Sequence, residues 1–192
     1  MADKGKLKRP LLEGALAVAT TAMVAGPAPA IAETFLKLGD IQGESTDIKH
    51  KGEIDILSFS QSFINTTTIG SAGGGAGAGK VQCGAVTMMK SIDASSPFLL
   101  KGAATGQHFP DATITFRSAA TGKNTTEYYV IKMQDVFVTE LSQTDSADPD
   151  RIFEKLVLNA RSFDFKYTPL TIKGTAGTPV SFKWDCAANK SD

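Results

Sequence analysis

The stretch from Lys37 to Phe63 places the strongest constraint on how this chain can fold. A turn-forming cluster rich in Gly, Asp and Ser occupies residues 39–45, and a charged segment follows it. From Ile54 onward, apolar residues are interleaved with small polar ones. This order predicts a strand, a tight polar loop and a second, longer strand. The second strand has one apolar and one hydroxyl face, which is typical of a strand that is half buried and half exposed to water.

The hydroxyl face of this strand is a candidate contact surface. It carries three small polar residues, Ser58, Ser60 and Ser62. We expect the alternating apolar residues to face the core, namely Leu57, Phe59 and Phe63. The pair Ile56-Leu57 breaks strict alternation, which predicts a bulge or a change of buried face there. A row of uncharged hydroxyls suits a wall that touches varied guests weakly, and an ordinary solvent-facing strand explains the same pattern.

Composition narrows the class of protein. The chain has 192 residues, of which 42% are hydrophobic, and its formal net charge is zero. This length predicts one domain with a substantial core, and the absence of net charge gives no global field to attract nucleic acid. The carboxylates are scattered, so we expect them on the solvated surface.

Residues 1–32 differ from the rest. A basic start with three lysines and Arg9 precedes an uncharged, Ala-rich segment that ends in Ala30-Ile31-Ala32. This pattern predicts an export signal cleaved after Ala32 and a secreted, extracellular product, while a disordered tail or a start codon placed too far upstream also explains it. Pro27 and Pro29 argue against a membrane-spanning helix. The predicted domain is therefore 33–192.

The remaining pattern predicts a mostly β protein. The expected strands are 33–38, 80–89, 112–117, 127–138, 151–167 and 180–186, with a hairpin turn at 121–124 and a polar loop at 143–150. One helix is expected over 93–106, with Ser95 or Ser96 as its cap and Gly106 at its end. Its expected apolar face consists of Phe98, Leu99, Leu100 and Ala103. Because a closed sheet has no exposed edges, we predict an antiparallel β-barrel (two-sheet) with one lateral α-helix.

A glycine-rich segment, 65–79, interrupts the strands. It matches G-x-x-x-x-G-K between Gly74 and Lys80, but a phosphate-binding loop needs Ser or Thr where Val81 stands, and a helix after it. We therefore interpret it as a loop or arm that becomes ordered against a partner. Its glycines are the candidate contact residues: Gly73, Gly74, Gly75, Gly77 and Gly79.

The sequence offers few reactive groups. His50 and His108 have no neighbouring nucleophile or metal-ligand spacing, so we predict no catalytic site, no metal and no cofactor. Cys83 and Cys186 can form a disulfide if the chain is exported, or remain as two buried thiols.

In its order of motifs, the chain resembles the haemolysin-coregulated protein (Hcp) family, the tube subunits of the bacterial type VI secretion system. The resemblance spans Glu33 to about Lys190. It is carried by Phe35-Leu36-Lys37-Leu38, Gly43-Glu44-Ser45, Glu53 to Ser60, Gly77 to Val81, Asp93 to Pro97, Asp135-Val136 and Val157-Leu158-Asn159.

The resemblance implies a non-enzymatic β-barrel that forms hexameric rings, which stack into a hollow tube. Implied partners are other copies of the chain, a spike protein, a sheath and small effectors in the lumen, without nucleic acid or stable membrane insertion. It places Ser60 on the lumen wall and the glycine loop at subunit and ring contacts. Family members normally lack an export signal and assemble in the cytoplasm, so the 1–32 segment keeps an alternative open: an exported binding protein or effector on the same barrel.

Overall fold

The computed structural model describes residues 33–66, 79–118, 126–145, 152–170 and 176–191. The predicted signal segment 1–32 and the predicted hairpin turn 121–124 lie outside these ranges. The described part contains ten strands and one helix: β1 (Glu33–Leu38), β2 (Ile54–Ile56), β3 (Ser58–Ser60), β4 (Phe63–Asn65), β5 (Val81–Cys83), β6 (Val86–Ser91), α1 (Ser96–Thr105), β7 (His108–Ser118), β8 (Thr126–Asp145), β9 (Ile152–Tyr167) and β10 (Val180–Asp185).

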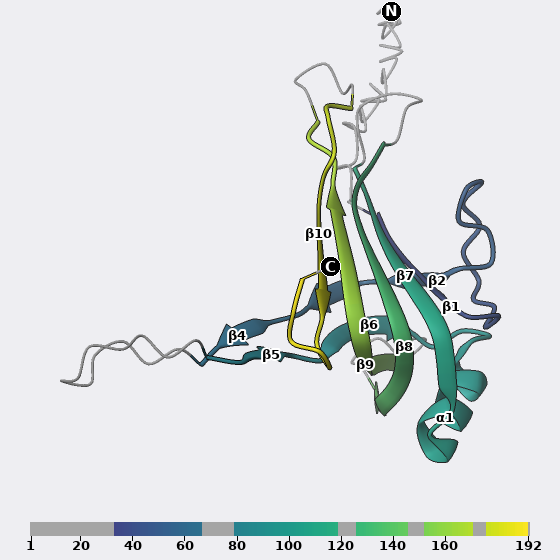
Figure 1. Cartoon of the computed structure of the whole chain (residues 1–192). Helices are drawn as coiled ribbons and strands as arrows, with labels where there is room; N and C mark the ends of the chain where they lie inside the picture. The colour runs from purple at the N-terminus through teal and green to yellow at the C-terminus, as the bar shows by residue number, and fades with distance from the viewer. Residues whose placement is uncertain (1–32, 67–78, 119–125, 146–151, 171–175, 192) are drawn as a thin grey trace, which may run out of the picture.

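The main sheet is antiparallel and closes on itself. Its order is β2-β1-β7-β8-β9-β6-β3, so its two outermost strands are consecutive in the chain and separated only by Leu57. The Leu57 amide donates to the Met89 carbonyl of β6 at 2.8 Å, which carries the pairing across this junction. One continuous segment therefore joins both ends of the sheet, and the predicted barrel with a lateral helix is confirmed (Figure 1).

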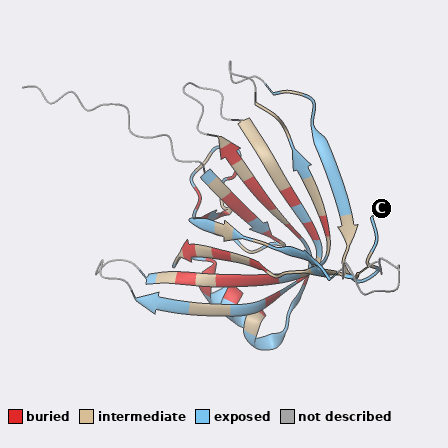
Figure 2. Cartoon of the chain, turned by 90° about the vertical axis from the view of Figure 1, so that its left-hand side faces the viewer, coloured by how far each residue is buried: buried red, intermediate tan, exposed pale blue. Residues whose placement is uncertain are grey.

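Two elements extend beyond the barrel. β10 pairs with the end of β9, and β4 with β5 forms a separate two-stranded sheet. Figure 1 shows this hairpin, called the arm below, projecting to one side while α1 lies on the other. The arm is described from Phe63 to Thr66 and from Gly79 to Cys83. In Figure 2 the buried residues line the barrel strands, whereas β10 is exposed or half-buried along its length.

Several expected strand limits were wrong. β7 and β8 are longer than expected, and β8 runs into the predicted polar loop because it pairs with β9 as far as Asp145↔Ile152. The expected strand 80–89 is split into β5 and β6 at Gly84, whose amide donates to the Ser62 carbonyl at 2.7 Å. A Cβ on Gly84 would lie 2.9 Å from that carbonyl oxygen, so the close approach requires glycine.

The buried face changes at Leu57. Ile54 and Ile56 are buried, and then Phe59 packs against the core with its ring 5.1 Å from that of Phe116. This confirms the predicted change of face. The expected core position of Leu57 was wrong, since its side chain is 58% exposed at the break between the two strands. Phe63 is also partly exposed, at the root of the arm.

α1 begins after Ser95, has Pro97 in its first turn and ends at Gly106, which adopts φ 64°. These ends agree with the expected cap and terminator. Its expected four-residue apolar face was wrong, because Leu99 is fully buried whereas Phe98 and Leu100 are more than half exposed. The helix thus rests on the barrel through a narrow stripe.

A buried ion pair holds the start of α1. Lys90 Nζ donates to Glu154 Oε2 at 2.7 Å, and both side chains are fully buried. Ser96 Oγ donates to the same oxygen at 2.6 Å, and Gln143 Nε2 donates to Glu154 Oε1 at 2.8 Å. Burial raises the pKa of Glu154, but these hydrogen bonds outweigh it and leave the pKa below its ordinary value. The expectation that the carboxylates lie on the surface was therefore wrong for Glu154.

Candidate functional site

One face of β3, β6, β9 and β8 forms a wall, called the polar wall below, in which small polar and charged residues surround the apolar Met89 and the buried Val157. Cross-strand register sets Ser60 opposite Thr87, and Ser58 opposite Met89, whose next partner is Lys155 on β9. Residues opposite one another in antiparallel strands share a face. The wall is therefore built from four strands and consists of Ser58, Ser60, Thr87, Met89, Lys155, Val157, Glu140 and Ser142.

A bulge in β8 extends this wall. The register shifts between Val138 and Glu140, so Val138 is buried while Glu140 points to the polar face. Glu140 Oε1 accepts a hydrogen bond from Lys155 Nζ at 2.7 Å, which lowers the pKa of that carboxyl group. The sequence did not reveal this pair, because a bulge is a property of two paired strands. The charges of Glu140 and Lys155 on the wall therefore neutralise each other.

Ser62 occupies a different position from the other two candidate serines. It lies beyond the end of β3, where its carbonyl accepts from Gly84 at the root of the arm. The structure therefore brings Ser58 and Ser60 together on the wall and separates Ser62 from them. Of the candidate glycines, Gly79 is described beside the arm strand β5, and Gly73, Gly74, Gly75 and Gly77 lie outside the described residues.

A disulfide joins the root of the arm to the end of the chain. Cys83 closes β5, Cys186 follows β10, and their Cα atoms are 6.1 Å apart. The segment from Cys186 to Ser191, called the hook below, turns back so that Asp185 and Lys190 pair through their backbones. Asn189 Oδ1 accepts from the Val81 amide of the arm at 2.9 Å. The hook thus holds the arm by one covalent and one hydrogen bond.

The loop between β1 and β2 is fixed by a buried arginine. Arg117 Nη1 donates to Asp47 at 2.5 Å, Arg117 Nη2 donates to Glu33, and its guanidinium lies over the Phe35 ring. Burial raises the pKa of Asp47, but the hydrogen bond from Arg117 and two backbone amides outweigh it and lower that pKa overall. This anchor presents Ile48 at the loop tip with 96% of its side chain exposed.

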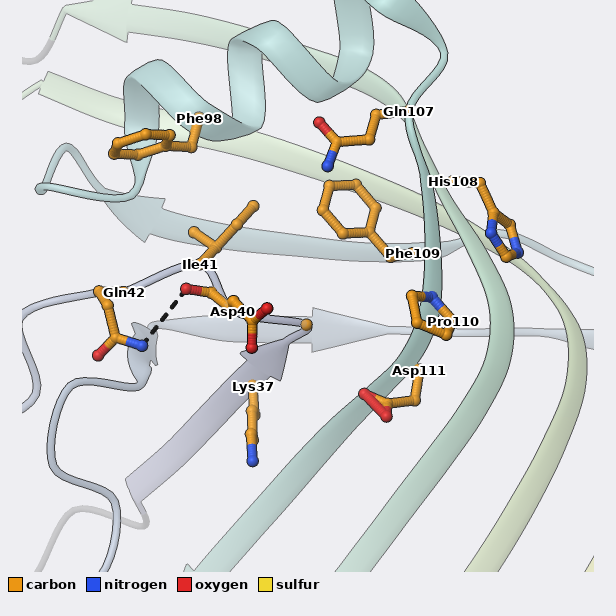
Figure 3. A pocket seen from close by; sticks show the side chains of 11 residues that line it. Lys37, Asp40, Ile41, Gln42, Phe98, Gln107, His108, Phe109, Pro110 and Asp111 are labelled. Atoms are coloured by element: carbon orange, nitrogen blue, oxygen red, sulfur yellow. Dashed lines mark hydrogen bonds between the residues drawn. The ribbon is translucent and has the colours of Figure 1, made fainter.

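An open cleft of about 560 Å³ lies between the turn after β1, α1 and the start of β7. Figure 3 shows the apolar side chains of Ile41, Phe98 and Phe109 on one side of it, and the charged Lys37, Asp40 and Asp111 below them in this view. Its lining mixes apolar and charged groups, and it faces outward between three elements.

Both histidines are engaged with carboxylates. His50 Nδ1 is 3.0 Å from Glu53, and its ring stacks on Phe35 at 4.3 Å. His108 Nε2 is 3.0 Å from Asp135, which has φ 50° where the buried face of β8 changes phase. These contacts give both imidazoles structural partners. In the part of the chain that the structure describes, no group of three or more His, Cys, Asp and Glu side chains is arranged to hold a metal.

Comparison with known proteins agrees with this architecture. The family model described as "Type VI secretion system effector, Hcp" matches residues 35–173. The curated "Protein hcp1" of Pseudomonas aeruginosa is 36% identical over 158 residues, which cover 82% of this chain and 96% of that protein.

The one helix of the described ranges, with ten residues, is too short to cross a bilayer.

Solved structures give the same result. "Structure of a type six secretion system protein" superposes with a TM-score of 0.78 at 26% identity, covering 84% of this chain and 100% of that one. Hcp1 from Salmonella typhimurium superposes with a TM-score of 0.69 at 30% identity, covering 84% and 99%. On its sequence, its closed barrel and its lateral helix, the chain belongs to the Hcp family of type VI secretion system tube proteins.

Proposed function

We propose that this chain is a structural tube subunit, that six copies form a ring, and that rings stack into a hollow tube that carries small effectors. The polar wall of β3, β6, β9 and β8 carries this proposal, because it presents small hydroxyl groups whose neighbouring charges, Glu140 and Lys155, neutralise each other. Such a wall makes weak contacts with many guests and has no strong field that would trap one of them.

Exposed apolar side chains support assembly through other faces of the protomer. Ile48 stands on an anchored loop and Phe98 lines the cleft beside α1, while Val180 and Phe182 lie on β10. Apolar groups presented on fixed elements are typical of surfaces that become buried in an oligomer. We infer that these side chains pack between neighbouring copies, leaving Ser58 and Ser60 facing the lumen.

Native mass spectrometry of the full chain tests the assembly. We expect a hexamer, because a closed ring buries these apolar groups on every copy. Electron microscopy of the same sample should show rings with a central hole. A strict monomer at high protein concentration would argue against the tube function and favour the exported binding protein. The subunit mass of protein recovered from the culture medium also shows whether residues 1–32 are removed. Cleavage after Ala32 would favour the exported binding protein, because the tube of this family assembles in the cytoplasm.

Ser60→Asp tests the lumen assignment. The side chain is exposed on a paired strand, so we expect a change in the free energy of unfolding within about 0.5 kcal/mol. The ring should remain a hexamer, but its lumen wall would carry a circle of six new carboxylates, one from each subunit. These charges should change which small proteins co-purify with the ring. Pull-down of acidic and basic cargo proteins of equal size measures this change.

Ser181→Asp is the matched control, since Ser181 is an exposed strand serine on β10, away from the polar wall. It should leave cargo retention unchanged. If Ser60→Asp unfolds the protomer, or both variants alter retention equally, the lumen assignment is wrong.

A further inference from the structure

The disulfide connects two segments, the arm and the hook, that lie outside the strand order of the main sheet. The arm lies outside the main sheet and contains only three residues in each described strand. A two-stranded hairpin of this length is marginally stable by itself. The hook, in turn, is attached through the Cys186 amide, which donates to the Arg161 carbonyl at 2.8 Å. Neither element has a large packed surface of its own.

Few other contacts fix the direction of the arm. At its root, the Phe63 ring lies 5.6 Å from that of Phe163 and 5.5 Å from that of Phe165. The Val81 amide is bonded to the Asn189 side chain. The Gly84 amide donates to the Ser62 carbonyl at the root, and the covalent link is the bond between Cys83 and Cys186, which are 103 positions apart in sequence. This bond therefore limits how far the arm can swing from the hook.

We propose that the Cys83–Cys186 bond is a redox-responsive staple that sets the orientation of the arm and thereby controls how rings stack. Both cysteines are half-buried, so a small thiol reagent can reach them. A dithiol reductant breaks the bond between the two Sγ atoms and supplies two electrons and two protons. The products are two protein thiols and the disulfide of the reductant. An oxidised glutathione-type disulfide reverses the reaction and is itself reduced to two thiols.

The cytoplasm and the cell exterior supply the reducing and the oxidising conditions, respectively. The cytoplasm keeps thiols reduced, whereas the cell exterior lets disulfides form and persist. A subunit assembled in the cytoplasm would then carry a hinged arm, and the same subunit outside would carry a fixed one. A fixed arm has already lost conformational freedom, so it loses less on docking to a neighbouring ring. The effect on stacking rests on the proposed tube function, whereas the effect on the arm does not.

Hydrogen exchange on the full chain tests the effect on the arm. Oxidised protein is compared with the same protein reduced by dithiothreitol, at a concentration where it is unassembled. We expect at least tenfold faster exchange of backbone amides in 81–83 and 185–190 after reduction, with no change in the barrel segment 131–138. The Cys83→Ser/Cys186→Ser variant should match the reduced protein and show no response to dithiothreitol. Equal exchange in both forms, or faster exchange throughout the barrel, would overturn the proposal.

Electron microscopy at assembly concentrations tests the effect on stacking. Oxidised protein should form tubes several times longer than those of reduced protein or of the serine variant. Rings that stack to equal length in both forms would overturn the control of stacking. Absence of rings from the oxidised protein would contradict the proposed tube function, while the exchange measurement would still decide whether the staple fixes the arm.

Discussion

Glu154→Leu should destabilise the protein by about 3–5 kcal/mol, the largest effect that we expect from a single substitution. The substitution removes the fully buried one of the two carboxylates that contact the Lys90 ammonium group, and leaves it with Asp93, whose Oδ1 is 2.9 Å from Nζ. It also removes the acceptor for Ser96 at the start of α1. Urea denaturation followed by circular dichroism measures the change in the free energy of unfolding.

The double variant Lys90→Met/Glu154→Leu distinguishes the effect of losing the ion pair from the effect of altered side-chain packing. Both fully buried charges are then replaced by apolar groups, which in buried pairs is often close to neutral, while the less buried Asp93 loses its contact with Lys90. We expect it to be more stable than Glu154→Leu alone. Glu140→Gln is the exposed counterpart, because the Glu140–Lys155 pair lies in solvent, and it should change stability by less than about 1 kcal/mol. Equal instability of the single and double variants would contradict the explanation from the loss of the buried partner of Lys90.

The same pair predicts how stability depends on pH. The pKa of Glu154 is lower in the folded protein than its ordinary value of 4.5, so folding favours the ionised form. Its stabilising contribution is fully present above that value and is lost as the pH falls through the depressed folded pKa. We therefore expect the free energy of unfolding of the wild type to fall relative to that of the double variant only below about pH 5. Urea denaturation of both proteins at a series of pH values measures this difference.

Leu99→Ala is expected to destabilise the protein by about 2–5 kcal/mol, because it opens a cavity under the helix. Leu99 is the large apolar residue of α1 that is fully buried, and the helix packs chiefly on β8. Gly102 lets the helix approach closely, since a Cβ there would lie 3.3 Å from the Phe109 ring. Leu99 is therefore the main apolar anchor of the helix, in addition to the polar contact of Ser96 with Glu154 at its start. Thermal and urea denaturation measure the effect.

Leu100→Ala is the matched control, since it removes the same atoms from a side chain that is 51% exposed. It should change stability by no more than about 0.5 kcal/mol. Leu100 is instead available for contact with another copy, so this variant is expected to affect assembly more than folding. If Leu99→Ala and Leu100→Ala are equally destabilising, the narrow-stripe description of the helix is wrong.

Local patterns predicted much of the fold. The alternation around Ile54 and Ile56 predicted a half-buried strand, and its interruption predicted the change of buried face. The cap and terminating glycine marked the ends of α1, although the expected helix over 93–106 began three residues before the observed start at Ser96. These features depend on neighbouring residues only, which is why the sequence reveals them.

The same patterns failed where pairing with another strand decides the outcome. Residue alternation did not show the bulge between Val138 and Glu140, because the extra residue is defined only against β9. It also did not show the phase change at Asp135, which depends on a left-handed backbone conformation. Both features determine which residues of β8 reach the polar wall.

By itself, the sequence determined the class of the fold, the candidate serines Ser58 and Ser60, and the resemblance to Hcp proteins. Only the tertiary structure decided that β2 and β3 close the barrel, that Lys90 meets Glu154, and that Cys83 meets Cys186. These contacts join residues far apart in the chain, whose proximity follows from strand order and register. Periodicity along one segment carries information about its own faces, but none about which distant segment will pack against them.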